Sequence, residues 1–341
     1  MARWTEAVEE PVQDLAEPDF APEPRRRSRF VTFLLFLPTL VFLAYAVVRV
    51  LSLETLVDNA FVVGTMALTP YVAALGFLLT VIMFLSRRRL LALVALISAL
   101  ALSALLGPRY LSEEQPQADG ERLRIMAANL YLGRADARAI VNLVRQQQID
   151  ILAMPELTPT EVSALDDAGL ADLLPYRVYE DRPGGDGGGI AAKLPLRKVI
   201  LMPDSALSQP SAVVDLPGRD DLELTAVHVL PPLSDQDTRT WRTELADLPK
   251  AEPGERLRIL AGDFNATLDH AAFRDLVDRG YADAGEESGE GLDSTWSSLP
   301  TGPPLTIDHI VTDSRCAIGS YAVHDLPGSD HNAIVAEVIL P

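Results

Sequence analysis

Two polar residues close the mostly apolar stretch RILAGDFNAT, which spans residues 258–267. Asp263 and Asn265 stand two positions apart, and side chains two apart on a β-strand share a face. They would therefore project together from the end of a strand, a position where binding and catalytic residues concentrate. A plain turn is the alternative, because Asp, Asn and Gly are common turn residues. The rest of the chain decides between the two.

The same pattern recurs at the ends of other strand-like segments. Polar residues follow or precede apolar runs at Asn129, Glu156, His228, Asp308, His309, Asp330 and His331. Each one alone fits a turn, a surface corner or a core histidine with satisfied hydrogen bonds. Their recurrence at the ends of successive strands favours one shared site.

The residue types in this set indicate a particular chemistry. Carboxylates and Asn carbonyls are hard oxygen donors, which suit Mg²⁺ or Mn²⁺ better than zinc. The sequence has no HExxH motif, and its single cysteine, Cys316, excludes a cysteine-based zinc cluster; we expect that cysteine to be a small buried side chain. A His paired with an Asp takes a proton from water, while a second His stabilises charge or protonates the leaving oxygen. The set therefore predicts metal-assisted hydrolysis of phosphoesters.

The elements that must position these residues begin at Arg122. Strand candidates include LRIMAANL, IDILAMPE, GGGIAAKL, LELTAVHVL, RLRILAGDF, IDHIVT and NAIVAEVIL, with helix candidates at ARAIVNLVRQQQ, TRTWRTELADL and HAAFRDLVDRG. Many strands with fewer helices predict a mixed sandwich of two sheets. The Gly-rich stretch at 183–190 lacks the spacing of the common phosphate-binding loops, so we predict a flexible turn before a strand.

The N-terminal third has a different composition. Residues 1–24 are acidic, Pro-rich and aperiodic, and together with the arginines that follow they predict a disordered cytoplasmic tail over residues 1–29. Three uncharged runs follow, at 30–48, 60–86 and 90–107, each long enough to span a bilayer, with Pro70 as a potential kink. A signal peptide and a buried helical hairpin fit three such runs poorly. We predict a three-helix transmembrane region over residues 30–107.

Arginine clusters indicate how these spans are oriented. They precede the first span and form the turn Arg87–Arg89 between the second and third, so the positive-inside rule places both in the cytoplasm. An odd number of spans then puts the chain after Gly107 outside the cell membrane. Residues 108–121 read as a polar linker of at most about 50 Å, which keeps the 122–341 domain near the membrane.

The charge of the chain is unevenly distributed. Residues 1–107 are neutral, so the formal net charge of −19 falls entirely on residues 108–341. Such a surface repels phosphate backbones, which argues against nucleic acid as a partner. A bound divalent cation would reverse the sign locally.

The ordered series AxN, PE, AVH, GDFN, IDHI and SDH resembles the endonuclease/exonuclease/phosphatase family, and GGGIAAKLPL and DSTW fit as well. The resemblance covers residues 122–341. It implies an α+β four-layer α/β/β/α sandwich of the deoxyribonuclease I-like type, here preceded by three transmembrane helices, and a metal-dependent phosphatase or phosphodiesterase activity.

The resemblance also implies roles. Glu156 would be the main Mg²⁺ or Mn²⁺ ligand, with Asn129 and Asp330 beside it. Asp263 would position or activate the water, and Asn265 and His228 would contact the phosphate. Asp308 would orient His331, the general base or transition-state stabiliser, and His309 would be structural.

Some positions depart from the family pattern. Pro155 replaces the usual Gln, and Tyr131 stands where some members have an acidic residue, which puts a second metal contact there in doubt. His270 and His324 match nothing in the pattern, and we expect them on the surface.

The substrate stays open at this level. Similarity to membrane-anchored bacterial members favours a lipid-linked phosphate or pyrophosphate at the outer membrane face, with the bilayer as partner. An exterior Mg-dependent nuclease is the alternative, and a non-catalytic scaffold is a third hypothesis. The sequence does not separate monoester, diester and pyrophosphate, and it does not determine an oligomeric state.

Overall fold

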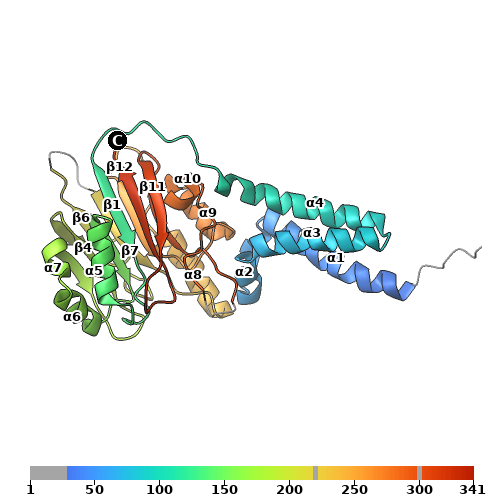
Figure 1. Ribbon diagram of the computed structural model, residues 1–341, viewed down its shortest axis with the longest axis horizontal. Coiled ribbons are helices and arrows are strands. Elements are labelled where there is room, and N and C mark those ends of the chain that lie inside the picture. The colour runs from blue at the N-terminus through green and yellow to red at the C-terminus, as the bar shows by residue number, and fades with distance from the viewer. Residues whose placement is uncertain (1–28, 218–221, 298–301) are drawn as a thin grey trace, which may run out of the picture.

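The computed structural model describes residues 29–217, 222–297 and 302–341. The tail predicted at residues 1–29 lies almost wholly outside the described residues. From Arg29 onward, an apolar helical bundle leads into a sandwich of two β-sheets, and the two parts lie end to end (Figure 1).

The bundle contains four helices and two short 3₁₀ turns. These are α1 (Arg29–Val50), η1 (Leu53–Leu56), α2 (Ala60–Met66), α3 (Thr69–Leu85), α4 (Arg89–Leu106) and η2 (Gly107–Tyr110). By length and composition, α1 and α4 could each cross a membrane. The second predicted span is not one straight helix, because α2 and α3 meet at a 77° bend. Pro70 lies in the first turn of α3, where its missing N–H costs nothing, so the break falls beside that residue.

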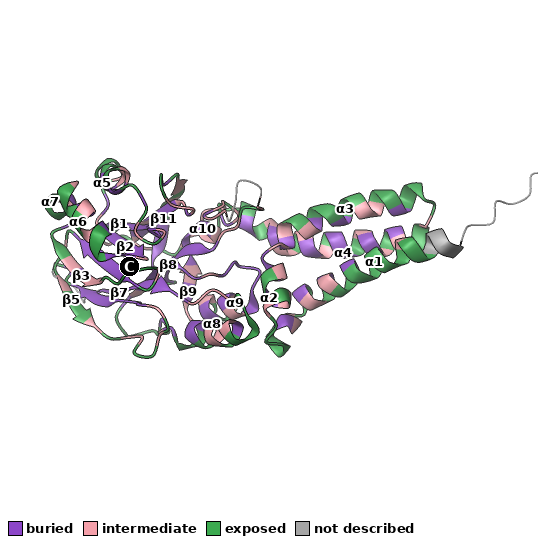
Figure 2. Ribbon diagram, turned by 90° about the horizontal axis from the view of Figure 1, so that it is seen from below, coloured by how far each residue is buried: buried purple, intermediate pink, exposed green. Residues whose placement is uncertain are grey.

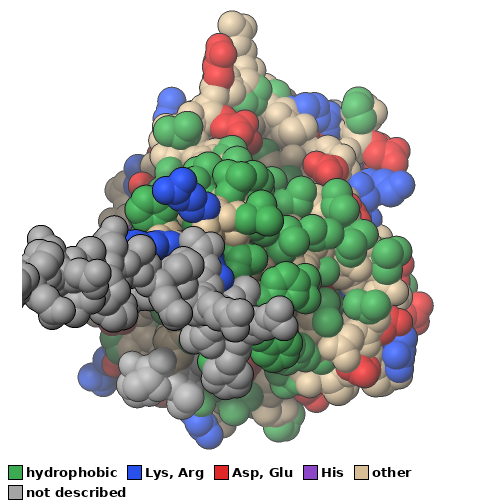
Figure 3. Space-filling view, turned by 90° about the vertical axis from the view of Figure 1, so that its right-hand side faces the viewer, with side chains coloured by type: hydrophobic (Ala, Val, Ile, Leu, Met, Phe, Trp, Pro, Cys, Tyr) green, Lys and Arg blue, Asp and Glu red, His purple; other side chains and the backbone are tan. Residues whose placement is uncertain are grey.

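The bundle is apolar on its outside and packed through small residues inside. Large side chains such as Phe33, Phe61 and Phe84 are exposed, and hydrophobic side chains gather on the face seen along the helices (Figure 3). The interior contains Ala95, Ala99 and Gly76, and a Cβ at Gly76 would collide with Phe42. Small residues let membrane helices approach closely while their apolar outer faces meet lipid.

The sandwich consists of two six-stranded sheets. The first has the order β11-β12-β1-β2-β4-β3 and contains β1 (Arg122–Ala127), β2 (Ile151–Pro155), β3 (Tyr176–Glu180), β4 (Gly188–Ala192), β11 (Ala317–His324) and β12 (Ala333–Ile339). The second has the order β5-β6-β7-β8-β10-β9 and contains β5 (Leu196–Val199), β6 (Ser211–Val214), β7 (Leu222–His228), β8 (Arg258–Asp263), β9 (Tyr281–Asp283) and β10 (Asp308–Asp313).

Helices cover the two outer faces. The described helices of the domain are α5 (Ala137–Gln146), α6 (Pro159–Asp167), α7 (Leu170–Leu173), α8 (Asp235–Asp247), α9 (Ala271–Val277) and α10 (Ala284–Glu287). Strand alternation separates the layers: Ile125 of β1 faces the core between the sheets, whereas Met126 packs outward with Ile140 of α5. On the other side Leu260 packs with Trp241 of α8. The predicted four-layer sandwich is confirmed, and buried residues line both sheets (Figure 2). Cys316 is buried, as expected.

The bundle docks onto the second sheet's helices through buried contacts. Val63 of α2 is fully buried in the cluster that contains Trp241 and Phe264. The ring of His270 contacts the Val63 carbonyl through Nε2 at 3.0 Å and is 3% exposed, so the expectation of a surface position was wrong for this histidine. His324 is half-buried. This histidine is a core residue because α2 covers it.

The predicted linker is partly fixed to the domain as well. Arg109, at its start, is 3% exposed. The Glu113 N–H donates to the Glu287 carbonyl at 3.0 Å, and Gln115 Nε2 donates to the Glu287 carboxylate at 2.8 Å. The domain is therefore packed against the bundle rather than suspended from it.

Candidate active site

Strand direction brings the predicted residues to one edge of the sandwich. In the second sheet, β7 and β8 are parallel and pair His228 with Asp263, while the antiparallel β10 places Asp308 opposite Asp263. The ends of β7 and β8 and the start of β10 therefore lie side by side. Because β10 runs the opposite way, a residue at its start joins residues at the ends of its neighbours.

The first sheet repeats this arrangement. Its strands β1 and β2 are parallel, and β12 is antiparallel to β1. Asn129 follows the end of β1, and Glu156 follows the end of β2. His331 precedes the start of β12 at the same edge of the sheet. Hydrogen bonds join the two sheets there: Asn129 Nδ2 donates to Glu156 Oε1 and to Asp263 Oδ2, both at 3.1 Å.

Through these two hydrogen bonds, Asn129 holds the carboxylates of Glu156 and Asp263 near each other. Its Oδ1 accepts from the Tyr131 N–H at 2.9 Å. Glu156 Oε2 accepts from the Leu132 N–H at 2.7 Å. The predicted role of Asn129 as a metal ligand requires its amide oxygen, so that role stays a prediction, while its positioning of Glu156 and Asp263 is directly visible.

His331 and Asp308 form the closest charged pair of the site. The ring Nδ1 lies 2.8 Å from Asp308 Oδ2, and Nε2 lies 3.8 Å from Asp263 Oδ2 and 3.9 Å from Asp330 Oδ1. Burial would lower the pKa of His331, but the charge of Asp308 and its hydrogen bond raise that pKa to about 10. Asp308 therefore favours the protonated ring, whose Nε2 points at the space shared with Asp263 and Asp330.

The carboxylates oppose ionisation of one another. Burial raises the pKa of Asp263 to about 7, and the charge of Asp308 adds to the increase. Burial also raises the pKa of Glu156, against the hydrogen bond from Asn129. Asp330 Oδ1 is buried without a hydrogen-bond partner among the described residues. Such a crowded set of oxygen donors fits a divalent cation, which would offset their mutual repulsion.

Another group of ligand-type atoms lies inside this set. Oxygens of Asp263 and Asp308 and a ring nitrogen of His331 all lie within 4.8 Å of one another and could hold a metal ion. Asp308 and His331 of this group are also joined by a hydrogen bond. The group is an alternative to the ligands predicted from the sequence, Asn129, Glu156 and Asp330, which stay a prediction.

His228 and Asn265 flank the carboxylates. Burial lowers the pKa of His228 to about 3, with a further decrease from the charge of His331, so its ring is neutral. Its Nε2 lies 3.9 Å from Glu156 Oε1, a polar contact and not an ion pair. Asn265 donates from Nδ2 to the Val229 carbonyl at 3.0 Å. Both side chains border the site, and their contact with phosphate stays a prediction.

The backbone is strained where these residues leave their strands. Tyr131, Leu132, Glu156 and Asn265 have φ values of 45°, 59°, 61° and 47°. Residues other than glycine rarely adopt this left-handed region, and such outliers concentrate at functional sites. Four of them around one edge support the assignment independently of side-chain chemistry.

His309 lies apart from this group. Its Nδ1 is 2.8 Å from Asp283 Oδ2, and its Nε2 is 2.9 Å from the Ala266 carbonyl. It therefore ties β9 to the loop that carries Asn265, in agreement with the structural role expected for it.

Three supporting features were not singled out by sequence reasoning. Thr295 Oγ1 accepts from the Asp308 N–H at 3.0 Å. Ser329 Oγ donates to the Asn129 carbonyl at 2.8 Å and accepts from the His331 N–H at 3.0 Å. The signal for these two residues was their place inside the DSTW and SDH stretches. The Gly-rich stretch also lies closer to the site than expected, since a Cβ at Gly185 would stand 3.5 Å from Glu156 Oε2.

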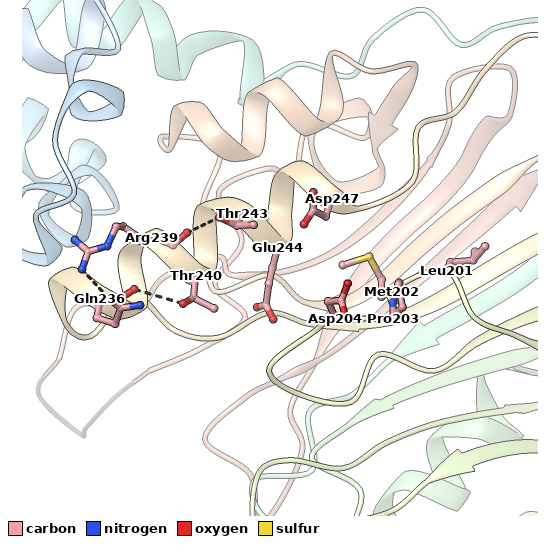
Figure 4. Close-up of a pocket in the computed structure, with 10 residues that line it drawn as sticks. All are labelled: Leu201, Met202, Pro203, Asp204, Gln236, Arg239, Thr240, Thr243, Glu244 and Asp247. Atoms are coloured by element: carbon pink, nitrogen blue, oxygen red, sulfur yellow. Dashed lines mark hydrogen bonds between the residues drawn. The ribbon is translucent and has the colours of Figure 1, made fainter.

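A hollow of about 580 Å³ between α8 and residues 201–204 does not include these residues (Figure 4). Its Glu244 is already engaged, accepting from Ser205 Oγ at 3.0 Å and from the Leu230 N–H at 2.8 Å. That carboxylate fixes the segment that follows His228. We therefore assign the hollow a structural role and do not include it in the candidate active site.

The model of the endonuclease/exonuclease/phosphatase family matches residues 126–331, more than half of the chain. The chain belongs to this family. Members of the family are divalent-metal-dependent phosphoester hydrolases, and the chain is an enzyme of that class. No curated protein matches the sequence significantly.

Solved structures agree with the fold. An endonuclease/exonuclease/phosphatase from Beutenbergia cavernae is 18% identical, with a TM-score of 0.50 over 64% of this chain and 72% of its own. A humanized TDP2 from D. rerio is 21% identical (TM-score 0.50, 64% and 98% covered). An AP endonuclease from Archaeoglobus fulgidus is 15% identical (TM-score 0.50, 63% and 98% covered). At these identities the likeness concerns the fold.

Proposed function

We propose that this family member is a membrane-anchored, Mg²⁺-dependent hydrolase of a lipid-linked phosphate or pyrophosphate. The observation that carries the proposal is the ion pair between the bundle and the loop that follows Asp263. Asp269, six residues after Asp263, accepts from Arg49 Nη2 in the last turn of α1 at 2.9 Å. Six residues span at most about 20 Å, so the site lies close to the end of that helix.

Apolar surface continues from the bundle onto the domain. Leu56, Phe61 and Leu233 are 77%, 79% and 81% exposed. Asp235, two residues after Leu233, accepts from the Ala60 N–H at 3.0 Å, so this loop lies beside the start of α2. Leu233 is also five residues after His228. An exposed apolar group between a membrane helix and a catalytic loop supports a substrate drawn from the bilayer.

The acidic domain supports the same choice. Its charge of −19 opposes nucleic acid, whose binding is dominated by backbone phosphates. Arginines before α1 and at Arg87–Arg89 support three spans, a cytoplasmic N-terminus and a catalytic domain outside the membrane. In this arrangement the broken pair α2–α3 forms the second span.

We assign each residue of the site a separate role in the hydrolysis. A Mg²⁺ ion held by Glu156 and Asp330 would polarise the phosphoryl group and offset its charge. The raised pKa of Asp263 suits a base that orients water and accepts its proton as the water oxygen attacks phosphorus, while the P–O bond to the leaving oxygen breaks and that oxygen departs with the bond's electron pair. His331, kept protonated by Asp308, donates from Nε2 toward the phosphoryl oxygens. Asn265 and neutral His228 would hold the phosphate by hydrogen bonds.

The test is phosphate release by the purified full-length protein in detergent with Mg²⁺. Undecaprenyl pyrophosphate and plasmid DNA are parallel substrates, and Glu156→Ala and His331→Ala are the site variants. Asp172→Asn, which removes an exposed acidic group on α7, is the control. We expect lipid turnover that both site variants abolish and the control retains. DNA cleavage without lipid turnover would instead identify an exterior nuclease.

A further inference from the structure

A cavity of about 270 Å³ lies between the bend of the bundle and the domain. One wall is formed by Ala67, Pro70, Tyr71 and Ala74, at and after the α2–α3 bend. The opposite wall is formed by domain loops, at residues 267–269, 291–292 and 304–306. The cavity is thus bordered by apolar membrane helix on one side and by domain loops on the other.

The same loops reach the active site. Asp308 follows Thr306 of the cavity wall by two residues, a span of at most about 7 Å. Leu305, also in the wall, exchanges backbone hydrogen bonds with Trp296 at 2.9 Å. The Trp296 indole Nε1 donates to Asp330 Oδ2 at 3.2 Å. The loop that lines the cavity therefore leads directly to Asp308 and contacts Asp330 through Trp296.

The membrane side of the cavity is joined to those loops directly. Tyr71 Oη on α3 donates to the Pro304 carbonyl at 2.6 Å. At the other end of the cavity, Arg109 Nη1 binds Asp269 Oδ2 at 3.0 Å. Arg109 is 3% exposed and shares that carboxylate with Arg49, so its guanidinium is held away from the cavity surface, and the remaining wall is mainly apolar. The lining suits an uncharged hydrocarbon better than a second phosphate.

We propose that this cavity receives the part of the lipid chain next to the phosphate, while the rest of the chain stays in the bilayer beside α3. The inference rests on the proposed lipid phosphoester substrate and specifies how that substrate is selected. Chain contacts in the cavity then place the phosphate at Asp263 and His331. A soluble phosphoester reaches the same carboxylates without using the cavity.

The experiment compares two substrates in nanodiscs: a long-chain polyprenyl phosphate and water-soluble bis(p-nitrophenyl) phosphate. Ala74→Trp fills the cavity from an exposed position on α3, so the core stays intact. Leu75→Trp, at a neighbouring position that is 61% exposed, is the matched control. We expect Ala74→Trp to raise KM for the long-chain substrate about tenfold, the equivalent of roughly two buried methylene groups. KM for the soluble ester and all values for Leu75→Trp should not change.

A binding measurement keeps the two proposals distinguishable. In the Ala74→Cys variant, maleimide labelling of the new thiol should be slowed by long-chain polyprenyl phosphate and not by inorganic phosphate. Unchanged KM in Ala74→Trp, with wild-type lipid turnover intact, overturns the cavity assignment alone. Absence of lipid turnover in the wild type counts against the proposed function. If, in addition, the lipid does not slow labelling of the thiol in Ala74→Cys, the cavity assignment is overturned as well.

Discussion

The carboxylate of Asp269 binds the guanidinium of Arg49 across 220 positions of the sequence, with Arg49 Nη2 2.9 Å from Oδ1 and both side chains almost fully buried. Arg109 binds the same carboxylate. One acidic residue in the loop after the catalytic strand thus holds the ends of the two helices that could cross a membrane.

Asp269→Ala should destabilise the protein by about 3–5 kcal/mol, because it leaves two buried arginines without their counter-charge. The loop that follows Asp263 should also become more mobile in this variant. Thermal unfolding in detergent measures the effect. Lys198→Ala, which breaks the half-exposed pair with Glu180, is the control and should cost less than about 1 kcal/mol. Equal losses in the two variants would contradict the assigned role.

Asp308→Asn should lower kcat by about 10²–10⁴ while leaving the fold intact, because the pKa of His331 loses its main support. His331→Ala should lower kcat to a similar extent. The double variant should be little worse than either single one, since the two residues act as a unit. Additive losses on a soluble phosphodiester would show that they act separately.

Removal of divalent metal should abolish hydrolysis and lower thermal stability. The carboxylates around Glu156 repel one another, so a cation bound to the folded state stabilises it by about 2.7 kcal/mol at 100 times its Kd. We expect Mg²⁺ to raise the Tm of the wild type and not that of Glu156→Gln. A Tm increase of the same size in Glu156→Gln would place the metal elsewhere.

His309 should stabilise the fold in a pH-dependent manner. Burial lowers its pKa, but the charge and hydrogen bond of Asp283 outweigh burial and raise it above the ordinary 6.5. A raised folded-state pKa gives stability that is fully present below pH 6.5 and is lost as pH rises through the folded-state value. The difference in unfolding free energy between wild type and His309→Gln should therefore shrink as pH increases, as measured by denaturant titration. Asp283→Asn should show the same trend; a difference that grows with pH would refute the pairing.

Much of the catalytic edge was predictable from local patterns. Strand periodicity and the polar residues at strand ends located Asn129, Glu156, His228, Asp263 and His331, because a residue that ends a buried strand has few alternatives to the sheet edge. Long uncharged runs likewise identified the bundle, since bilayer thickness sets the length of an apolar helix.

Other features depended on contacts between distant segments. The burial of His270 under Val63 and the fixed linker at Arg109 both arise from docking of the bundle on the domain. The supporting hydrogen bonds of Thr295 and Ser329 were equally invisible in a linear pattern.

Element types, the apolar bundle and the residue types of the candidate site follow from the local sequence, because periodicity and residue chemistry are local properties. Three pairings became visible only in the folded chain: His331 with Asp308, His309 with Asp283, and Asp269 of the loop after β8 with the bundle. Those pairings follow from strand register and helix docking, which bring together side chains that no local rule connects.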